Sequence, residues 1–152
     1  MQGSAGPSRG VKFLGSYQHS IDEKGRVSLP APFRREAADR RFVLAQPYPP
    51  ALALYPEVEW ADVESRLADM LAKGTEERLY VLGILANAVE VTPDAQGRIL
   101  IPSKLKEAAG LGNTVLLVGA ITKVELWSPE SFEKTVTGRP SELQQFTTQL
   151  FR

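Results

Sequence analysis

The chain of 152 residues contains no cysteine and only one histidine, His19. The absence of cysteine excludes disulfides, thiolate metal sites, iron–sulfur clusters and thiol nucleophiles. A single histidine also excludes metal sites built from several histidines. We therefore expect no metal site and no cofactor.

Long hydrophobic runs are also missing. No apolar stretch approaches the roughly 20 residues that span a bilayer, so we expect no membrane partner. The first ten residues lack the apolar segment of a secretory signal, which favours a cytoplasmic location. Residues 1–12, where glycine and serine are frequent, are expected to form a flexible extension.

Charge of one sign is not in excess, because 18 Lys and Arg balance 18 Asp and Glu. The distribution is nevertheless uneven. Residues 1–46 carry eight basic and four acidic side chains, whereas residues 47–90 carry three and eight. The neutral total argues against a nucleic-acid binder that relies on bulk charge. It leaves open a protein with one basic face, beside the plainer alternative of a mixed surface.

A catalytic constellation is missing as well. Residues 19–22 contain the histidine, serine and aspartate of a hydrolase triad, but consecutive residues of a strand point to opposite faces. The carboxylates between residues 57 and 64 are best explained as a solvated helix face. We expect no enzymatic activity.

The chain does contain an internal repeat. Residues 22–30 read DEKGRVSLP and residues 94–102 read DAQGRILIP, seventy-two positions later. The same offset continues without a gap over about forty positions and aligns Val43 with Val115. Recurring identities and apolar positions at a fixed offset indicate a duplication.

Each copy alternates short strands with turns. Apolar and polar residues alternate with the period of two that is typical of half-buried strands. The predicted strands are 16–21, 27–29, 41–45 and 51–55 in the first copy, and 88–92, 99–101, 114–118 and 123–127 in the second.

Short helices are expected directly after Pro30 and Pro102, where the second strands stop. In the second copy Ser103 is the predicted N-cap and Gly110 stands where a C-terminal glycine belongs.

A longer helix closes the first copy, with apolar residues at helical spacing from Trp60 to Met70 and Gly74 at its end. The next segment, 79–85, is apolar nearly all round, which predicts burial on most of its sides. In the second copy Ser128 and Pro129 supply an N-cap and a first helical proline.

Neither copy buries enough apolar surface to fold alone. We therefore predict an α+β protein in which two tandem βαββα-type repeats, related by a pseudo-twofold axis, share one β-barrel with flanking helices. The repeats are assigned to residues 13–83 and 84–136, and residues 137–152 form an amphipathic tail.

The repeated Asp-x-x-Gly-Arg turn suggests a function. Gly25 and Gly97 permit the positive φ of a tight turn, and Asp22 and Asp94 can accept hydrogen bonds from its amides. A turn does not require arginine, yet arginine is unchanged in both copies while the core residues around it differ. Two equivalent arginines are suited to a repeating ligand.

Five side chains are candidate DNA contacts, at Lys24, Arg26, Arg34, Gln96 and Arg98. For Arg34 a solvated helix face is the favoured interpretation. Gln96 fits an adenine edge or a polar turn equally well.

Residues 13–30, together with the second Asp94–Pro102 motif and residues 123–127, resemble the MraZ family over about residues 13 to 136. The resemblance implies a barrel like the AbrB/SpoVT swapped-hairpin fold and assembly into a homo-oligomeric ring. It also implies a nucleoid-associated regulator of the division and cell-wall gene cluster, which binds short direct repeats upstream of that cluster. By the same resemblance Arg26 and Arg98 are the principal DNA contacts.

Two departures qualify this likeness. The bridging helix keeps only Arg78 of an arginine-rich stretch, and the second motif has Ala95 and Gln96 in place of a basic pair. The first copy is therefore predicted to make the stronger electrostatic contact. An antitoxin-like protein of the same fold, which binds a toxin through its apolar tail, is the alternative function.

Overall fold

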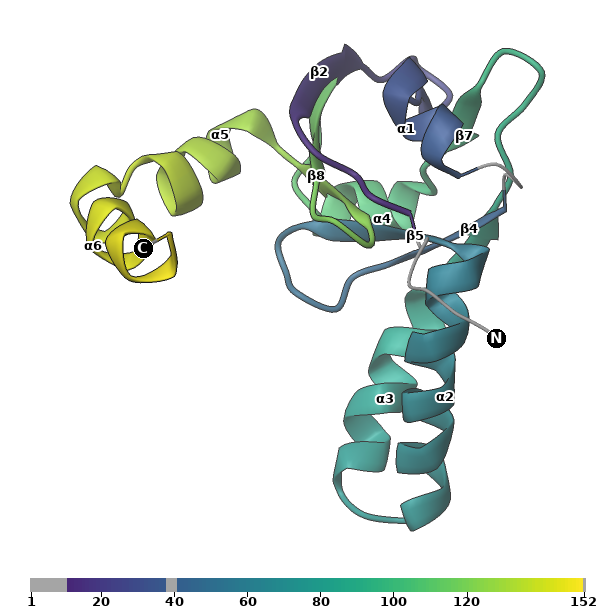
Figure 1. The fold of residues 1–152 in the computed structure, drawn as a ribbon. Helices are drawn as coiled ribbons and strands as arrows, with labels where there is room; N and C mark the ends of the chain where they lie inside the picture. Colours follow the sequence, from purple (N-terminus) through teal and green to yellow (C-terminus); the bar gives the residue numbers. More distant parts are fainter. Residues whose placement is uncertain (1–10, 38–40, 152) are drawn as a thin grey trace, which may run out of the picture.

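The computed structural model of the chain describes residues 11–37 and 41–151 (Figure 1). Residues 1–10 of the expected extension lie outside the described residues. In chain order the elements are β2 (Ser16–Ser20), β3 (Arg26–Ser28), α1 (Ala31–Glu36), β4 (Phe42–Ala45), β5 (Leu52–Pro56), α2 (Glu57–Lys73), α3 (Glu77–Asn87), β6 (Val89–Val91), β7 (Arg98–Leu100), α4 (Ser103–Ala108), β8 (Thr114–Gly119), β9 (Val124–Trp127), α5 (Pro129–Phe132), the π-helix η1 (Glu133–Thr137) and α6 (Pro140–Leu150).

The fold is α+β, and its strands form two antiparallel sheets. Six strands pair in the order β2-β8-β9-β5-β4-β6, and β3 pairs with β7 in a separate two-stranded ladder. Among the described residues β2 and β6 stay at opposite edges of the larger sheet and do not pair. The expected closed barrel is therefore not seen. Closure would require β2 to pair with β6, whereas the strands that follow these two, β3 and β7, pair with each other in a separate ladder.

The two repeats exchange strands. The first strand of repeat one, β2, pairs with β8 of repeat two, and β6 of repeat two pairs with β4 of repeat one. Each repeat keeps only the pairing of its third and fourth strands, β4 with β5 and β8 with β9. The six-stranded sheet is therefore built from strands of both repeats.

Two ladders show that the repeats are related by a pseudo-twofold axis. In the β3–β7 ladder Val27 lies opposite Ile99, its own equivalent seventy-two residues later. In the β5–β9 ladder Ala53 lies opposite its equivalent, Glu125. A residue that lies near a twofold axis faces its equivalent in the other repeat across that axis. The pseudo-twofold axis therefore passes between Val27 and Ile99 and between Ala53 and Glu125.

The ungapped alignment of the repeats is wrong in the third strand. In the sheet His19 lies opposite Val115, and its equivalent Val91 lies opposite Phe42, so Phe42 and not Val43 is the counterpart of Val115. A shift of one residue turns every side chain to the other face of a strand. The core requires this shift, because Phe42 and Val115 both belong to the buried cluster.

The core lies between the larger sheet and the β3–β7 ladder, with α1 and α4 packed beside it (Figure 1). It combines equivalent apolar residues of both repeats. Edge-to-face aromatic contacts join the N-terminal segment to α1, with ring centroids of Phe13 and Phe33 5.4 Å apart and those of Tyr17 and Phe33 5.3 Å apart. One core serves both copies.

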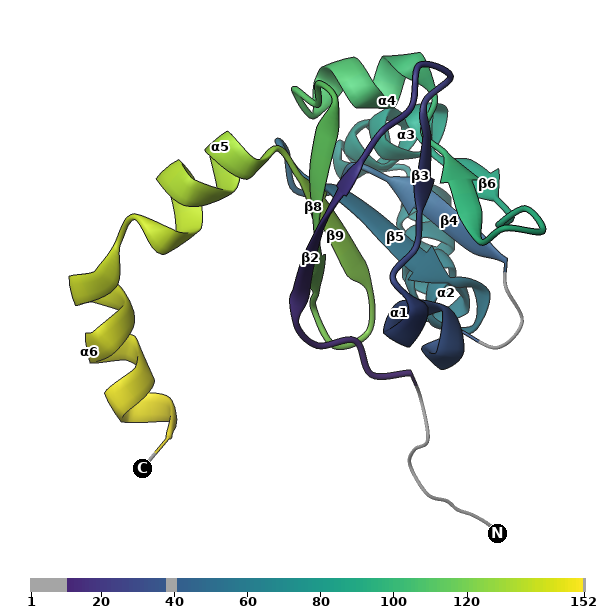
Figure 2. The ribbon, with the colours of Figure 1, turned by 90° about the horizontal axis from the view of Figure 1, so that it is seen from above.

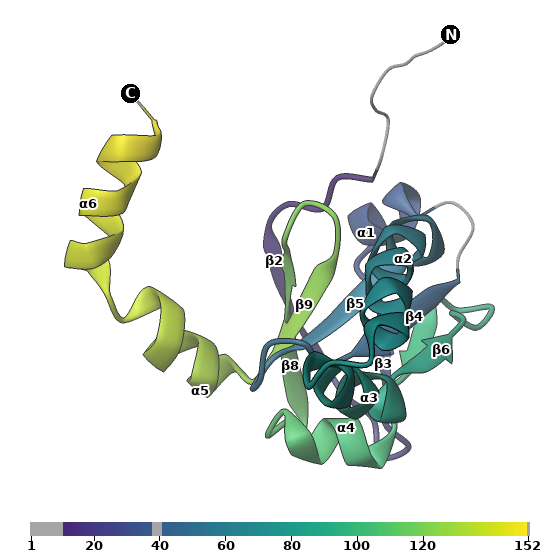
Figure 3. The ribbon, with the colours of Figure 1, turned by 90° about the horizontal axis from the view of Figure 1, so that it is seen from below.

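Helices α2 and α3 form a hairpin that starts over β4 and β5 (Figure 3) and then extends beyond the sheet (Figure 1). Gly74, with φ of 68°, ends α2 as predicted. The expected burial of α3 is wrong within a single chain, because the hairpin leaves the sheet and only Val81 of this helix is buried. Its other apolar residues include the exposed Leu79, Tyr80 and Leu82.

The helix ends follow the sequence with one exception. Ser128 caps α5 as predicted, since its side chain accepts a hydrogen bond from the Ser131 amide at 3.1 Å. At α4 the N-cap is Pro102, and Ser103 is already helical, so its hydroxyl makes no capping bond. The tail forms α6, which stands clear of the sheet (Figure 1). Within the described chain, no helix has the length and apolar character needed to cross a membrane.

Candidate nucleic-acid interface

The turn between β2 and β3 is organised by Asp22. One carboxylate oxygen, Oδ1, accepts hydrogen bonds from the amides of Lys24 at 2.9 Å and Arg26 at 2.8 Å. The other, Oδ2, accepts from Arg26 Nε at 2.9 Å. One aspartate therefore fixes both the backbone of the turn and the direction of its arginine.

The turn between β6 and β7 repeats this geometry. Asp94 Oδ1 accepts from the amides of Gln96 at 2.9 Å and Arg98 at 3.0 Å, and Oδ2 accepts from Arg98 Nε at 2.9 Å. The same five-residue pattern thus builds the same local structure twice, although the residues between aspartate and glycine differ.

Hydrogen bonding favours the charged form of both aspartates. The amide of Arg26 lowers the pKa of Asp22 below its ordinary value of 3.8, and Lys24 and the Arg26 guanidinium act in the same direction. The amide of Arg98 lowers the pKa of Asp94 in the same way. At neutral pH each turn holds an ionised carboxylate against its arginine.

Glycine is required in both turns for two reasons. Gly25 has φ of 89° and Gly97 has φ of 79°, in the left-handed region that favours glycine. A Cβ on Gly25 would lie 2.8 Å from the carbonyl oxygen of Ile101, and a Cβ on Gly97 would lie 2.8 Å from the Arg34 side chain. The turns are therefore pressed against the opposite repeat.

The β3–β7 ladder has one buried and one outward face. Val27 and Ile99 point into the core. In the register of the ladder Arg26 lies opposite Leu100 and Ser28 lies opposite Arg98, so these four residues share the outward face. We call this face the outer ladder face. Figure 2 shows the turn after β2 and the turn after β6 at separate ends of this region.

The two arginines are held but still accessible. The side chain of Arg26 is 34% exposed and that of Arg98 is 30% exposed. Each donates its Nε to an aspartate, and the terminal nitrogens of both guanidinium groups make no hydrogen bond to other described residues. A preoriented guanidinium with two unused nitrogens can bind an anion or a base edge in bidentate fashion.

Lys24 and Gln96 occupy equivalent exposed positions in the two turns. Lysine adds a cation to the first turn, and the second turn has a neutral amide at the same place. Their amides bind the aspartates, so both side chains extend from backbone that is held in place.

Arg34 belongs to repeat one in sequence but lies against the second turn. Its Nη1 donates to the carbonyl of Leu29 at 2.7 Å, and its side chain packs over Gly97. Together with Arg35 it lines an open cavity of about 500 Å³ against residues 93–97. Sequence reasoning missed this proximity, because residues 34 and 97 are far apart in the chain and no local pattern connects them.

Two other polar residues of the first repeat, His19 and Arg41, make contacts within the fold. His19 Nδ1 lies 2.6 Å from the carbonyl oxygen of Ser28, so the histidine ties β2 to β3 and does not form a triad with Asp22. Arg41 lies 3.8 Å from Glu57 in an exposed ion pair. Arg40, the other arginine of that segment, lies outside the described residues.

Comparison with known proteins matches one family twice. A family described as "MraZ protein, putative antitoxin-like" matches residues 12–81 and again residues 84–150. The chain is 39% identical over 122 residues to a protein named transcriptional regulator MraZ from Desulforamulus reducens, a match that covers 80% of this chain and 85% of the relative. A relative of the same name from Thermoanaerobacter pseudethanolicus is 42% identical over 121 residues, which cover 80% of this chain and 84% of the relative. Another, from Carboxydothermus hydrogenoformans, is 33% identical over 138 residues, which cover 91% of this chain and 96% of the relative.

Proposed function

Since the chain belongs to the MraZ family, we propose that it is a non-catalytic transcriptional regulator that binds double-stranded DNA with the outer ladder face. The observation that carries this proposal is the pair of turns in which Asp22 and Asp94 orient Arg26 and Arg98 in the same way. Each arginine also forms an ion pair with its aspartate, but that aspartate already binds two amides of the turn, so the pair is not needed to close the turn and leaves the terminal nitrogens of the guanidinium accessible.

The dimensions of the outer ladder face suit the major groove, which admits a two-stranded β-ribbon. Arg26 and Arg98 are diagonal neighbours across the ladder, so their Cα atoms lie roughly 7–8 Å apart. That separation is about two base-pair steps of about 3.4 Å each. The two terminal nitrogens of an arginine match the O6 and N7 acceptors of guanine. Lys24 then contacts phosphate, and Gln96 and Arg34 contact DNA beside the second turn.

We further propose that residues 13–83 and 84–136 act as two repeats of one unit with the AbrB-like swapped-hairpin arrangement. The exchange of β2 and β6 between the repeats supports this arrangement, as does the pseudo-twofold axis through Val27 and Ile99. One protomer then presents two related but unequal DNA contacts.

A single protomer offers too few cations for tight binding at cellular salt, so we propose a ring-shaped homo-oligomer. Linking protomers turns later contacts into intramolecular ones and raises avidity by roughly 10²–10⁴. Two apolar surfaces are uncovered in one chain and support assembly: Leu79, Tyr80 and Leu82 on the hairpin, and Leu143, Phe146 and Leu150 on α6. Direct repeats upstream of the division and cell-wall gene cluster, in a nucleoid-associated complex, would match neighbouring protomers of such a ring.

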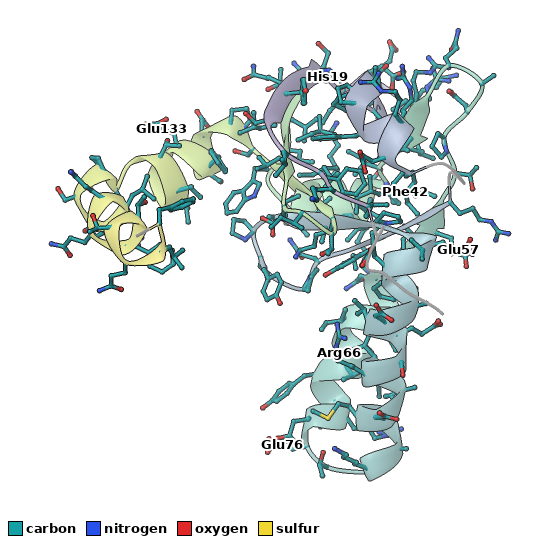
Figure 4. All side chains as sticks on the ribbon, viewed as in Figure 1. His19, Phe42, Glu57, Arg66, Glu76 and Glu133 are labelled. Atoms are coloured by element: carbon teal, nitrogen blue, oxygen red, sulfur yellow. The ribbon has the colours of Figure 1, made fainter. Side chains whose placement is uncertain are left out.

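The test is a gel-shift titration with the DNA upstream of the protein's own gene. Arg26→Ala and Arg98→Ala are expected to weaken specific binding, each by on the order of 1–3 kcal/mol per contact, and to leave the melting temperature nearly unchanged. Arg66→Ala is the matched control, because Arg66 lies on the projecting hairpin, far from His19 and the turns (Figure 4). Normal operator binding by Arg26→Ala in a destabilised protein would show that the arginine serves the turn alone.

Light scattering tests the ring. We expect a mass larger than a dimer at micromolar concentration, and a smaller one after removal of residues 139–152. A monomer of 16.7 kDa for the full chain would contradict the assembly.

The family description and the uncovered face of α6 favour one second candidate, an antitoxin-like role in which α6 binds a toxin. A small toxin gene beside this gene, and a stable complex of the two products, would support that role over transcriptional regulation.

A further inference from the structure

The outer ladder face is chemically asymmetric at its centre. The pseudo-twofold axis relates Ser28 to Leu100, so a small hydroxyl faces outward on one side and a branched apolar side chain on the other. Leu100 is 51% exposed although its neighbours along the chain, Ile99 and Ile101, are buried. Exposed leucines are common in proteins and do not by themselves indicate a functional site, so a role for Leu100 has to be argued from the residues around it.

Those surroundings are the proposed DNA contacts. Leu100 lies directly opposite Arg26 across the ladder and two residues along the same strand from Arg98. Its Cδ1 lies 3.6 Å from the position that a Cβ on Gly25 would occupy, so the side chain rests against the first turn. An apolar group is thereby fixed between two arginines, where water or a ligand meets it.

A guanidinium that reaches a base edge brings its ladder neighbours to the floor of the same groove. The floor of the major groove offers one apolar group, the C5-methyl of thymine; the other groups are hydrogen-bond donors and acceptors. A leucine facing donors or acceptors would leave them without partners, whereas a leucine facing the methyl group loses nothing. Serine, in contrast, can bond to several bases.

We propose that Leu100 is a specificity-determining residue that contacts the C5-methyl group of a thymine beside the guanine bound by Arg26, and that the Ser28 side reads no such methyl. This inference rests on the proposed function. It makes the site recognised by one protomer asymmetric in spite of the pseudo-twofold axis, so that a protomer binds DNA in one orientation only.

The test is a methyl scan. The sequence protected in a footprint of the upstream DNA is made as a duplex, and each thymine is replaced in turn by deoxyuridine, which lacks only the C5-methyl group. For the natural protein we expect one thymine in each direct repeat of the DNA at which the replacement weakens binding roughly fourfold, the change in affinity expected for the loss of one buried CH₂ group. Replacement at other thymines should have little effect.

Variants assign the methyl contact to its residue. Leu100→Ser, which gives positions 28 and 100 the same side chain, should bind natural DNA as weakly as the natural protein binds the sensitive uridine duplex, and should no longer distinguish the two duplexes. Leu100→Met should retain the distinction. Leu14→Ser is the control, because Leu14 is 63% exposed but lies outside the ladder, and this variant should behave as the natural protein does.

The outcomes separate this inference from the function on which it rests. If the natural protein does not bind the upstream DNA specifically, or Arg26→Ala binds it normally, the proposed function itself fails. If binding is specific and depends on Arg26, but no thymine is sensitive or Leu100→Ser keeps the sensitivity, only the role of Leu100 is refuted.

Discussion

Three glycines with positive φ allow two effects of substitution by alanine on stability to be separated, namely backbone strain and steric contact with neighbouring atoms. Gly74, Gly25 and Gly97 have φ of 68°, 89° and 79°. A Cβ on Gly74 would meet nothing within 4 Å, one on Gly97 would meet the flexible Arg34 side chain, and one on Gly25 would meet the backbone oxygen of Ile101. Alanine therefore introduces the same backbone strain at all three positions. It adds no steric contact at Gly74, a contact with a flexible side chain at Gly97 and a contact with backbone at Gly25.

The expected costs follow from these contacts. Alanine in the left-handed region costs roughly 1–2 kcal/mol, and for Gly74→Ala this is the whole effect. Gly97→Ala must also displace Arg34 from its hydrogen bond to Leu29, which adds about 0.5–1.5 kcal/mol. Gly25→Ala pushes against the backbone carbonyl of Ile101, directly after β7, an overpacking cost of roughly 1–3 kcal/mol. The free energy of unfolding should fall least for Gly74→Ala and most for Gly25→Ala.

Denaturant unfolding at one fixed protomer concentration measures this order, since assembly makes stability depend on concentration. A double-mutant cycle provides the internal control. Combined with Arg34→Ala, Gly97→Ala should cost at least about 0.5 kcal/mol less than the sum of the single changes, whereas Gly25→Ala should be additive with it. Equal losses for all three glycines, or no coupling between positions 34 and 97, would refute the close approach of the repeats at these turns.

Three further predictions concern charge and strain. Lys24→Ala should reduce the slope of log affinity against log salt by about 0.9 per lost phosphate contact and leave sequence preference intact; an unchanged slope in anisotropy titrations would contradict the phosphate role. The pKa values of Asp22 and Asp94 are lowered by folding, so both carboxylates stabilise the protein above their unfolded pKa near 3.8 and lose this effect as the pH falls through the folded pKa. Asp22→Asn and Asp94→Asn should thus make the melting temperature less sensitive to acid below about pH 4, and a parallel decline in variant and natural protein would count against this linkage. Ile121 is 58% exposed and has φ of 71°, in the left-handed region that strains a branched residue. Ile121→Gly should therefore raise the melting temperature by about 2–4 °C for each kcal/mol of strain relieved. A lower melting temperature would disprove that strain.

The sequence predicts local structure well where one residue type has one conformational role. Gly74 ends α2, Ser128 caps α5, and both Asp-x-x-Gly-Arg motifs form turns. Short strands also appear close to the expected positions, because alternation of apolar and polar residues reports which face is buried. The two arginine turns could therefore be singled out as candidate sites from the order of residues in the chain.

Pairing between distant strands could not be predicted in the same way. The choice of β8 as the partner of β2 depends on contacts about a hundred residues apart in the chain, and the mostly polar sequence of β2 does not specify which strand it pairs with. The one-residue shift between Phe42 and Val115 is hidden for the same reason, since both third strands are apolar runs in which either register looks buried. The exposure of α3 depends on where the hairpin leaves the sheet, which its composition does not encode.

The placement of Arg34 changes how the two turns compare. From the sequence, the first turn has the larger positive charge, because Lys24 corresponds to the neutral Gln96. In the fold, Arg34 and Arg35 line the cavity beside the second turn and bring cations of repeat one to the motif of repeat two. The two sides then differ in kind more than in total charge: the first combines Lys24 with the apolar Leu100, and the second combines Gln96 with Arg34. Under the proposed function, two unchanged arginines with four divergent neighbours are suited to binding two different halves of one DNA site, and neither half could be predicted from one repeat alone.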